Sequence, residues 1–234
     1  MRVTFDHSEA EAANIRTFYF RPEQPMHYTA GQFTELYVPH VEPDDRGQKR
    51  WFTLSSSPTD ELLSITTKFA GDTSSSFKKA LFGLPEGTEL TMADAMGDFV
   101  LPKLVQTPLI FVAGGIGITP MHSMLEWLAM TNEQRSIQLI YGVHSEDEII
   151  FQDTFERAGI HATIVVSEPS AAWGGERGQL SAELILGLTK PTDDTLMYVS
   201  GPEIMVQHLH KDLQAAGIPR ANLVSDEFPN YKSI

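Results

Sequence analysis

The residue pattern changes near residue 103, and this change constrains the fold more than any other feature of the chain. The first hundred residues carry short runs rich in Val, Ile, Thr and aromatic residues, separated by turn clusters that contain Pro or Gly. A helix is expected at 75–81. The runs that we predict as strands are 16–20, 33–38, 51–55, 62–69 and 89–92. Regularly spaced short strands predict a small antiparallel β-barrel of the Greek-key type.

Beyond residue 103, strand-like and helix-like segments alternate, which predicts a parallel sheet with helices on both faces. Strands are expected at 109–113, 137–141, 162–166, 195–199 and 222–225, and helices at 121–130, 149–158, 181–186 and 203–216. We therefore predict two domains, the β-barrel over 1–103 and a doubly wound α/β domain over 104–234. The strand order expected in the second domain is 3-2-1-4-5.

Composition narrows the class of protein. The chain has 234 residues and no Cys, which excludes disulfides, cysteine-ligated zinc, iron–sulfur clusters and thiol catalysis. Its eight His show no metal-binding spacing, so no metal site is expected. The net charge of −14 argues against nucleic acid as a partner and predicts repulsion of acidic electron carriers. Neither a membrane span nor a signal peptide is expected, which favours a cytoplasmic location.

The segment 113–120, Ala-Gly-Gly-Ile-Gly-Ile-Thr-Pro, follows an all-apolar strand and opens a helix. Gly115 and Gly117 let the backbone come close to a ligand, and amides at the start of a helix attract anions such as a pyrophosphate. Thr119 is expected to cap the helix and Pro120 to occupy its first turn. The alternative is a tight strand-to-helix turn that binds no ligand.

A second glycine turn, Ser200-Gly201-Pro202, follows the predicted strand at 195–199 and precedes another helix. In the order 3-2-1-4-5 the first and fourth strands are neighbours, and open α/β sheets bind ligands at such a point. We therefore expect Gly115 and Gly201 to flank one crevice. Two routine turns would explain each glycine but not why both fall at this pair of strands.

The segment 50–58, Arg-Trp-Phe-Thr-Leu-Ser-Ser-Ser-Pro, begins on a predicted strand. Because strand side chains alternate, Arg50 and Phe52 are expected on one face and Trp51 on the other, packed against the protein. A guanidinium beside a flat ring suits a ligand that is anionic at one end and planar at the other, such as a flavin nucleotide. The alternative is an amphipathic strand with Phe52 and Leu54 in the core and Arg50 in solvent.

Taken together, and in their order along the chain, the motifs resemble those of the ferredoxin–NADP reductase superfamily over nearly the whole sequence. The matching segments are 28–33, 50–53, 71–77, 96–99, 114–120 and 226–231. The resemblance implies a two-domain oxidoreductase that binds FAD and NAD(P)H and carries no iron–sulfur domain. FAD is favoured over FMN because the Gly-x-x-Ser turn at 71–77, which binds a pyrophosphate in the family, would be idle with a mononucleotide.

The resemblance also implies roles for individual residues. Arg50 would hold a flavin phosphate, Phe52 would stack on the isoalloxazine ring, and Thr53 would donate to flavin N5. Further flavin-binding residues are expected at Thr67, Lys68, Ser75, Ser76 and Tyr231, and the residues expected at the nicotinamide nucleotide are Gly115, Gly117, Thr119, Gly201 and Pro202. Thr53, Ser200 and Glu227 are the expected catalytic residues. Glu227 would hydrogen-bond a carboxamide, or would be a solvated tail residue.

The sequence departs from the family pattern at several positions. Ser200 stands where the family often has Cys, and it lacks the bulk and polarisability of sulfur, so slower hydride transfer is expected. Glu168 stands where NADP-preferring relatives commonly have Arg, and its carboxylate would repel a 2′-phosphate. Arg177 could reach the same region and reverse this argument, so NADH is only slightly favoured. Ala93 replaces the usual Gly-Pro, which leaves the details of barrel closure open.

The expected function is therefore hydride transfer from NAD(P)H to FAD, followed by delivery of electrons to an acceptor or carrier that the sequence does not identify. The alternative is an electron-transfer or regulatory subunit, which binds the same nucleotides but turns over only with a partner chain.

Overall fold

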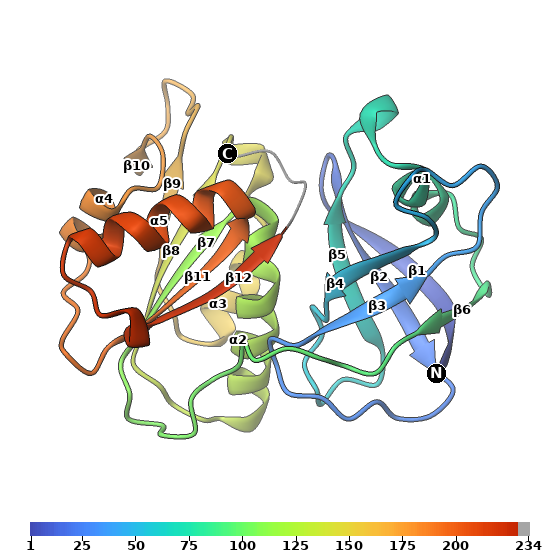
Figure 1. Cartoon of the computed structure of the whole chain (residues 1–234), viewed down its shortest axis with the longest axis horizontal. Coiled ribbons are helices and arrows are strands. Elements are labelled where there is room, and N and C mark those ends of the chain that lie inside the picture. The colour runs from blue at the N-terminus through green and yellow to red at the C-terminus, as the bar shows by residue number, and fades with distance from the viewer. Residues whose placement is uncertain (229–234) are drawn as a thin grey trace. The chain divides into compact units, whose positions relative to one another are not determined.

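The computed structural model describes residues 1–228. It divides into two compact units, Met1–Val100 and Leu101–Ile234. Figure 1 draws the first from blue to green and the second from green to red. The division lies close to the boundary expected at residue 103. Tyr231, which we expect near the flavin, lies outside the described residues.

The first unit is built on one six-stranded antiparallel sheet in the order β4-β3-β6-β1-β2-β5. Its strands are β1 (Arg2–Ala12), β2 (Ile15–Pro22), β3 (Phe33–Tyr37), β4 (Lys49–Thr53), β5 (Leu63–Lys68) and β6 (Glu89–Met92). The Ser55 amide, just after β4, donates to the Ser64 carbonyl on β5 at 2.8 Å. This bond joins the two ends of the strand order, so the sheet curls into the expected antiparallel barrel.

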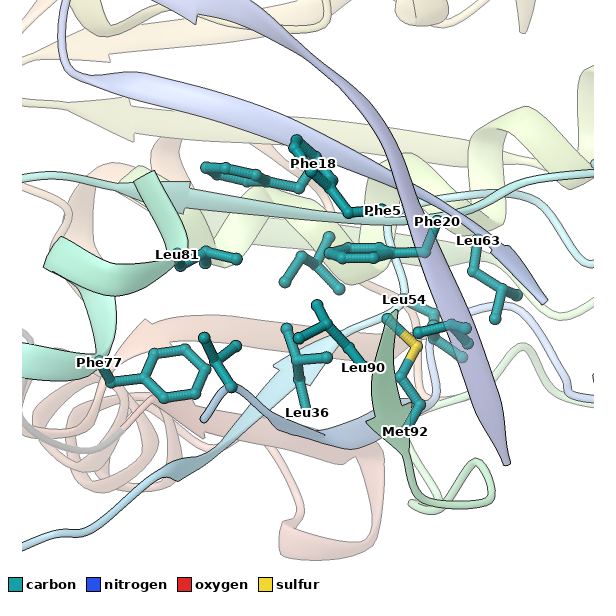
Figure 2. Packing of buried hydrophobic residues seen from close by; sticks show 13 residues of the cluster. Phe5, Phe18, Phe20, Leu36, Leu54, Leu63, Phe77, Leu81, Leu90 and Met92 are labelled. Carbon is teal, nitrogen blue, oxygen red and sulfur yellow. The ribbon is translucent and has the colours of Figure 1, made fainter. Parts of the chain in front are cut away.

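The interior of this barrel is filled by aromatic and aliphatic side chains (Figure 2). Phe5 lies between Phe18 and Phe20, with ring centroids 6.0 and 5.8 Å away. Helix α1 (Ser76–Phe82) adds Phe77 and Leu81, both fully buried. Burying each large apolar side chain stabilises the fold by roughly 1.5–3 kcal/mol. This core holds β4 and α1, which carry the expected flavin residues, next to each other.

Strand β1 was not among the predicted strands. Its first half alternates as a half-buried strand should, with Val3 and Phe5 inward, but its second half, His7–Ala12, is polar and charged. Two register irregularities in its pairing with β2 shift the alternation further. The strand is stabilised by pairing with both β2 and β6, and such long-range pairing leaves little trace in a local pattern.

The second unit contains a parallel sheet in the order β10-β9-β8-β7-β11-β12. Its strands are β7 (Leu109–Gly114), β8 (Ile137–Val143), β9 (Ala162–Val166), β10 (Glu176–Arg177), β11 (Leu196–Pro202) and β12 (Leu223–Phe228). With β7 counted as the first strand, the predicted order 3-2-1-4-5 is confirmed. The short strand β10 extends the β9 edge and was not expected.

Helices cover both faces of this sheet (Figure 1). They are α2 (Thr119–Thr131), α3 (Gln152–Arg157), α4 (Ala182–Leu188) and α5 (Glu203–Ala215). Val206 and Leu209 of α5 pack with Val112 of β7 and Val199 of β11 in one buried cluster. Alternation therefore turns Ala113 and Ser200 toward the opposite face, on which α2 lies. Among residues 1–228, no helix is long and apolar enough to cross a membrane.

Strands β11 and β12 both run well beyond their predicted ends at residues 199 and 225. β11 continues through Pro202, and β12 continues to Phe228. Ser200, Gly201 and Pro202 are therefore strand residues, and α5 begins only at Glu203. The added length comes from mutual pairing, since the last three residues of β11 are in register with the last three of β12.

Candidate functional site

Strand β4 presents a cation and an aromatic ring on the same face, as expected. The Arg50 guanidinium lies 5.3 Å from the centroid of the Phe77 ring, and the Phe52 ring lies 5.7 Å from the same ring. Trp51 points the other way, but the expected packing of its side chain is wrong. It is 67% exposed, and its ring contacts Phe33 at 5.7 Å.

The Arg50 side chain is buried and already has hydrogen-bond partners within the protein. Its side chain is only 8% exposed, and Nη2 donates to the Asp44 carboxylate at 2.7 Å. Nη1 donates to the backbone carbonyls of Arg46, Gly47 and Lys49. Nε is buried and has no hydrogen-bond partner within residues 1–228. A buried cation with an unsatisfied donor fits an anionic ligand such as a flavin phosphate, because an unpaired buried donor carries a desolvation cost.

The other residues expected at the flavin are held by contacts within the first unit. Thr53 is buried at the end of β4 and is in register with Phe33 of β3. By alternation it belongs to the Trp51 face of the strand rather than to the Phe52 face. Thr67 is fully buried on β5, and Lys68, whose carbonyl accepts from the Lys78 Nζ, is the last residue of that strand.

The two expected pyrophosphate serines have different partners. Ser75 is the N-cap of α1, and its Oγ accepts from the Lys78 amide at 3.2 Å. Ser76 Oγ accepts from the Asp44 amide at 2.8 Å and lies 3.0 Å from His40 Nε2. The structure therefore brings Ser76 close to the surroundings of Arg50 through Asp44, while Ser75 stabilises the start of α1.

The two glycine turns of the second unit are in direct contact. A Cβ added at Gly117 would lie 2.5 Å from the Gly201 Cα, which no real Cβ tolerates. A Cβ at Gly201 would lie 2.9 Å from the Gly114 carbonyl oxygen, and Gly201 has a φ of 152°. Gly115 has a φ of 52°, in the left-handed region that favours glycine. The predicted proximity of the two turns is therefore observed. The close approach of their backbones is one reason why both positions 117 and 201 need a glycine.

The expected cap at Thr119 is wrong. Gly115–Ile118 forms a 3₁₀ turn, Ile118 stands at the N-cap position of α2, and Thr119 is already helical. Its hydroxyl donates to the Ile116 carbonyl at 3.0 Å, so it stabilises the glycine turn instead. Pro120 lies in the first turn of the helix, as predicted.

The pairing of β11 with β12 separates two neighbouring carboxylates. Ser200 is in register with Asp226, so the two side chains share the α2 face of the sheet. Glu227 is in register with Gly201 and belongs to the α5 face, where it accepts from Gln207 Nε2 at 3.3 Å. The structure therefore places Asp226 beside Ser200, and it does not bring the expected catalytic Glu227 there.

Asp226 was missed by the sequence analysis. Burial raises the pKa of its carboxyl from 3.8 to about 6, and the nearby charge of Glu227 adds to the shift. Ser200 Oγ is buried and has no hydrogen-bond partner among the described residues. The signal that would have found Asp226 is the length of β11, since extending that strand to Ser200 fixes which neighbour in β12 faces it.

A cavity of about 300 Å³ lies in the second unit, at the ends of β8 and β9 and beside α5. Gly142, Ser167, Gln179, His208 and Asp212 are among the residues that line it, and its lining contains neither Lys nor Arg. It has the concave form and mixed polarity of a small-molecule site.

The charged residues expected to decide the nucleotide preference lie on the segment after β9. Glu168 Oε2 is 3.4 Å from His144 Nε2, and both side chains are largely exposed. The guanidinium of Arg177 donates to the carbonyls of Ser170 and Trp173, at 3.3 and 2.5 Å. Arg177 therefore holds its own loop together in this structure.

Comparisons with known proteins agree with this geometry. Residues 111–211 match the oxidoreductase NAD-binding domain family. The chain is 26% identical to the NADH oxidoreductase HCR of Escherichia coli, covering 94% of this chain and 66% of the relative. It is also 26% identical to the glycine betaine monooxygenase reductase subunit of Chromohalobacter salexigens, covering 93% and 61%. The chain spans between 54% and 66% of the length of the curated relatives that it matches.

A solved structure shares the whole fold. The FAD/NAD-binding domain of a nitric oxide dioxygenase from Vibrio cholerae superposes with a TM-score of 0.83 at 21% identity, covering 97% of this chain and 98% of that one. The fold and the glycine site thus define a two-domain protein whose second unit is of the NAD-binding class. Residues 111–211 match an oxidoreductase NAD-binding family, and the two units have the fold of ferredoxin–NADP reductase-like proteins, in agreement with the resemblance seen in the motifs.

Proposed function

We propose that this chain is a flavoprotein reductase that uses NADH or NADPH to reduce FAD and passes the electrons to an acceptor. FAD, when bound, would supply the redox chemistry that links hydride transfer to electron transfer. The protein would bind and orient the nucleotides. The observation that carries this proposal is the contact between the turns of Gly117 and Gly201. It creates a glycine-lined edge of a parallel sheet, with the unpartnered Ser200 hydroxyl beside it.

The first unit would bind FAD through β4 and the start of α1. Arg50 supplies the buried positive charge for a phosphate, and Phe52 lies on the same face to meet a planar ring. Ser75 and Ser76 stand at the start of α1, where a pyrophosphate would add acceptors for their hydroxyls and amides. The proposed FAD site therefore offers a positive charge to the phosphates and an aromatic ring to the isoalloxazine.

The second unit would hold the nicotinamide end of the dinucleotide at the glycine turns. Gly115, which carries no side chain, leaves its backbone accessible to a flat ring. Ser200 Oγ and the Asp226 carboxyl share one face of the sheet and would hydrogen-bond the carboxamide. A carboxyl with a pKa of about 6 is available both as a donor and as an acceptor near neutral pH.

NADH is the nucleotide that the charges of the second unit favour. The 300 Å³ cavity, which would take the adenosine half, has Asp212 in its lining and neither Lys nor Arg among the described residues that line it. Glu168 adds a second carboxylate on the segment after β9, and Arg177 is engaged with the Ser170 and Trp173 carbonyls. A 2′-phosphate would meet repulsion there and would find no bidentate partner.

The test is spectroscopic and then kinetic. The purified chain is expected to bind FAD, released as free flavin on denaturation, and to reduce ferricyanide with NADH faster than with NADPH. Protein that neither carries nor takes up flavin would refute the proposal. Bound FAD without ferricyanide reduction by the isolated chain would support the alternative of a subunit that depends on a partner, which the name of one relative, a reductase subunit, keeps open.

The acceptor is a separate proposal. The net charge of −14 favours an acceptor or carrier with a basic docking surface over an acidic one, because like charges repel at long range. Rates with a panel of haem and iron–sulfur proteins, measured at low and high salt, would identify the class, since steering by opposite charges weakens as salt rises.

A further inference from the structure

The segment 40–50 of the first unit wraps around its own arginine. Among the residues that the structure describes, the hydrogen-bond acceptors of the Arg50 guanidinium all lie within 44–49: the Asp44 carboxylate and the carbonyls of Arg46, Gly47 and Lys49. With 8% of its side chain exposed, Arg50 is not reachable by a phosphate in this arrangement. A ligand that is to pair with Arg50 must therefore displace part of this wrap.

Asp44 makes contacts that an anionic ligand would also make. Its Oδ1 accepts from Arg50 Nη2 at 2.7 Å, and its Oδ2 accepts from the Ser76 amide at 3.2 Å. The guanidinium and the hydrogen bonds together hold the pKa of the Asp44 carboxyl below its usual value, although burial opposes this. The carboxylate is thus ionised and bridges the same two groups, Arg50 and Ser76, that the proposed function assigns to the flavin phosphates.

The hold on Ser76 is reciprocal. The Asp44 amide donates to Ser76 Oγ, and His40 Nε2 lies 3.0 Å from the same oxygen. Asp44 Oδ1 also accepts from the Arg46 amide at 3.0 Å, which closes a local turn through Gly47. The segment is therefore held at Arg50, at Ser76 and by its own backbone, and Asp44 and Arg50 form an ion pair within it.

We propose that Asp44 is an internal competitor of the FAD phosphate: its carboxylate occupies Arg50 and the Ser76 amide in the flavin-free protein and is displaced when FAD binds. The inference rests on the proposed function, since it requires Arg50 to be a phosphate ligand. Its consequence is that Asp44 sets the affinity for FAD and the rate at which it enters. The unpartnered Nε of Arg50 is then the donor that gains a partner on exchange.

Asp44→Asn is the sharpest variant, because the amide oxygen of Asn keeps an acceptor for the Arg46 amide, while the charge and the second acceptor, which bonds the Ser76 amide, are lost. Asp45→Asn is the matched control, since it removes the same charge from an exposed position one residue away. Arg50→Ala reports whether the guanidinium binds FAD at all. FAD binding to flavin-free protein would be followed by quenching of flavin fluorescence and by stopped flow, and the Tm would be measured with and without FAD.

Competition predicts that Asp44→Asn tightens FAD binding by about 3- to 30-fold, since a charge-assisted bond is replaced by a weaker one that is partly open to solvent. The association rate should rise, the Tm of the flavin-free protein should fall, and the Tm of the FAD-bound protein should change less. Asp45→Asn should change the affinity less than twofold. If Asp44→Asn does not fold, Asp44→Ser serves as the second variant, with the same expected signs.

Weaker or unchanged FAD binding by Asp44→Asn would overturn the inference and would make Asp44 a residue that positions Arg50. A decrease in Tm that is equal with and without FAD would overturn it too, because a purely structural contact persists in both states. If the wild-type chain takes up no FAD, or if Arg50→Ala leaves its affinity unchanged, the proposed flavin site itself fails. The two failures are therefore distinguishable.

Discussion

Gly117 lies so close to Gly201 that a Cβ on Gly117 would be 2.5 Å from the Gly201 Cα. Gly117 lies in the turn after β7 and Gly201 lies near the end of β11, far away in the sequence. Neither position leaves space for a side chain on the other. This contact joins the two glycine turns into one edge.

Gly117→Ala is expected to destabilise the second unit. The added methyl group must push the β11 backbone away, and such overpacking typically costs about 1–3 kcal/mol, which lowers the Tm by roughly 2–4 °C per kcal/mol at this chain length. The KM for NADH should rise as the two turns separate. Gly187→Ala is the control, because a Cβ there meets nothing within 4 Å. Equal stability of both variants in urea would contradict the role given to this contact.

Arg50→Lys separates charge from geometry at the proposed flavin site. The variant keeps a cation near Asp44 but loses the planar fork of donors. FAD affinity is expected to fall by roughly tenfold, and Arg50→Ala by roughly 10- to 150-fold, the range of one charge-assisted hydrogen bond. Fluorescence titration with FAD measures both, and circular dichroism of the flavin-free proteins checks that the barrel is intact. Wild-type affinity in Arg50→Ala would exclude Arg50 as a phosphate ligand.

Asp226 is expected to make stability fall as the pH rises through its titration. Its folded pKa of about 6 lies above the unfolded value of 3.8, so the folded state binds the proton more tightly. Folding therefore carries no penalty from this group below about pH 4 and the full penalty above about pH 6, on the order of 1–3 kcal/mol. Asp226→Asn should be more stable than the wild type at pH 7.5 and equally stable at pH 4.

The measurement is urea unfolding of both proteins across this pH range, with the difference between them as the readout. Asp194→Asn, on an exposed loop of the same unit, is the control and should differ from the wild type by less than about 0.5 kcal/mol at either pH. A constant difference for Asp226→Asn over the whole range would show that its carboxyl does not titrate there.

Glu168→Gln is expected to raise kcat/KM for NADPH by about 3- to 10-fold and to leave that for NADH within twofold. The carboxylate is largely exposed, so its repulsion of a 2′-phosphate is partly screened. Glu176→Gln, at an exposed position on the short strand β10, is the control for a change in overall charge. Initial rates with both nucleotides at two salt concentrations give the ratio, and an unchanged ratio would mean that Glu168 does not select the nucleotide.

Much of the architecture follows from local pattern. Strand β7 could be predicted from its all-apolar sequence, because a buried parallel strand needs apolar residues on both faces. The glycines and the helix α2 follow it directly. The direction of Arg50, Trp51 and Phe52 was predicted correctly, because strand alternation is a property of the backbone. The exposure of the Trp51 side chain was not predicted, because it depends on which segments cover that face of the sheet.

Other features required the pairing of distant segments. Strand β1 has a weak pattern and exists because two partners bond to it. The extension of β11 through Pro202 depends on β12, and this extension decides that Asp226 rather than Glu227 shares a face with Ser200. A shift of one residue in that register would exchange the two carboxylates, and nothing in either segment alone specifies it.

The sequence by itself determined the two-part β and α/β organisation and the positions of the glycine turns, because these follow from hydrophobic periodicity and from the backbone freedom of glycine. The tertiary structure alone decided that Gly117 touches Gly201, that Asp226 lies beside Ser200, and that Asp44 holds Arg50. The physical reason is that each of these contacts joins groups whose distance is set by sheet register or by the closure of a loop, and both depend on the packing of the folded unit.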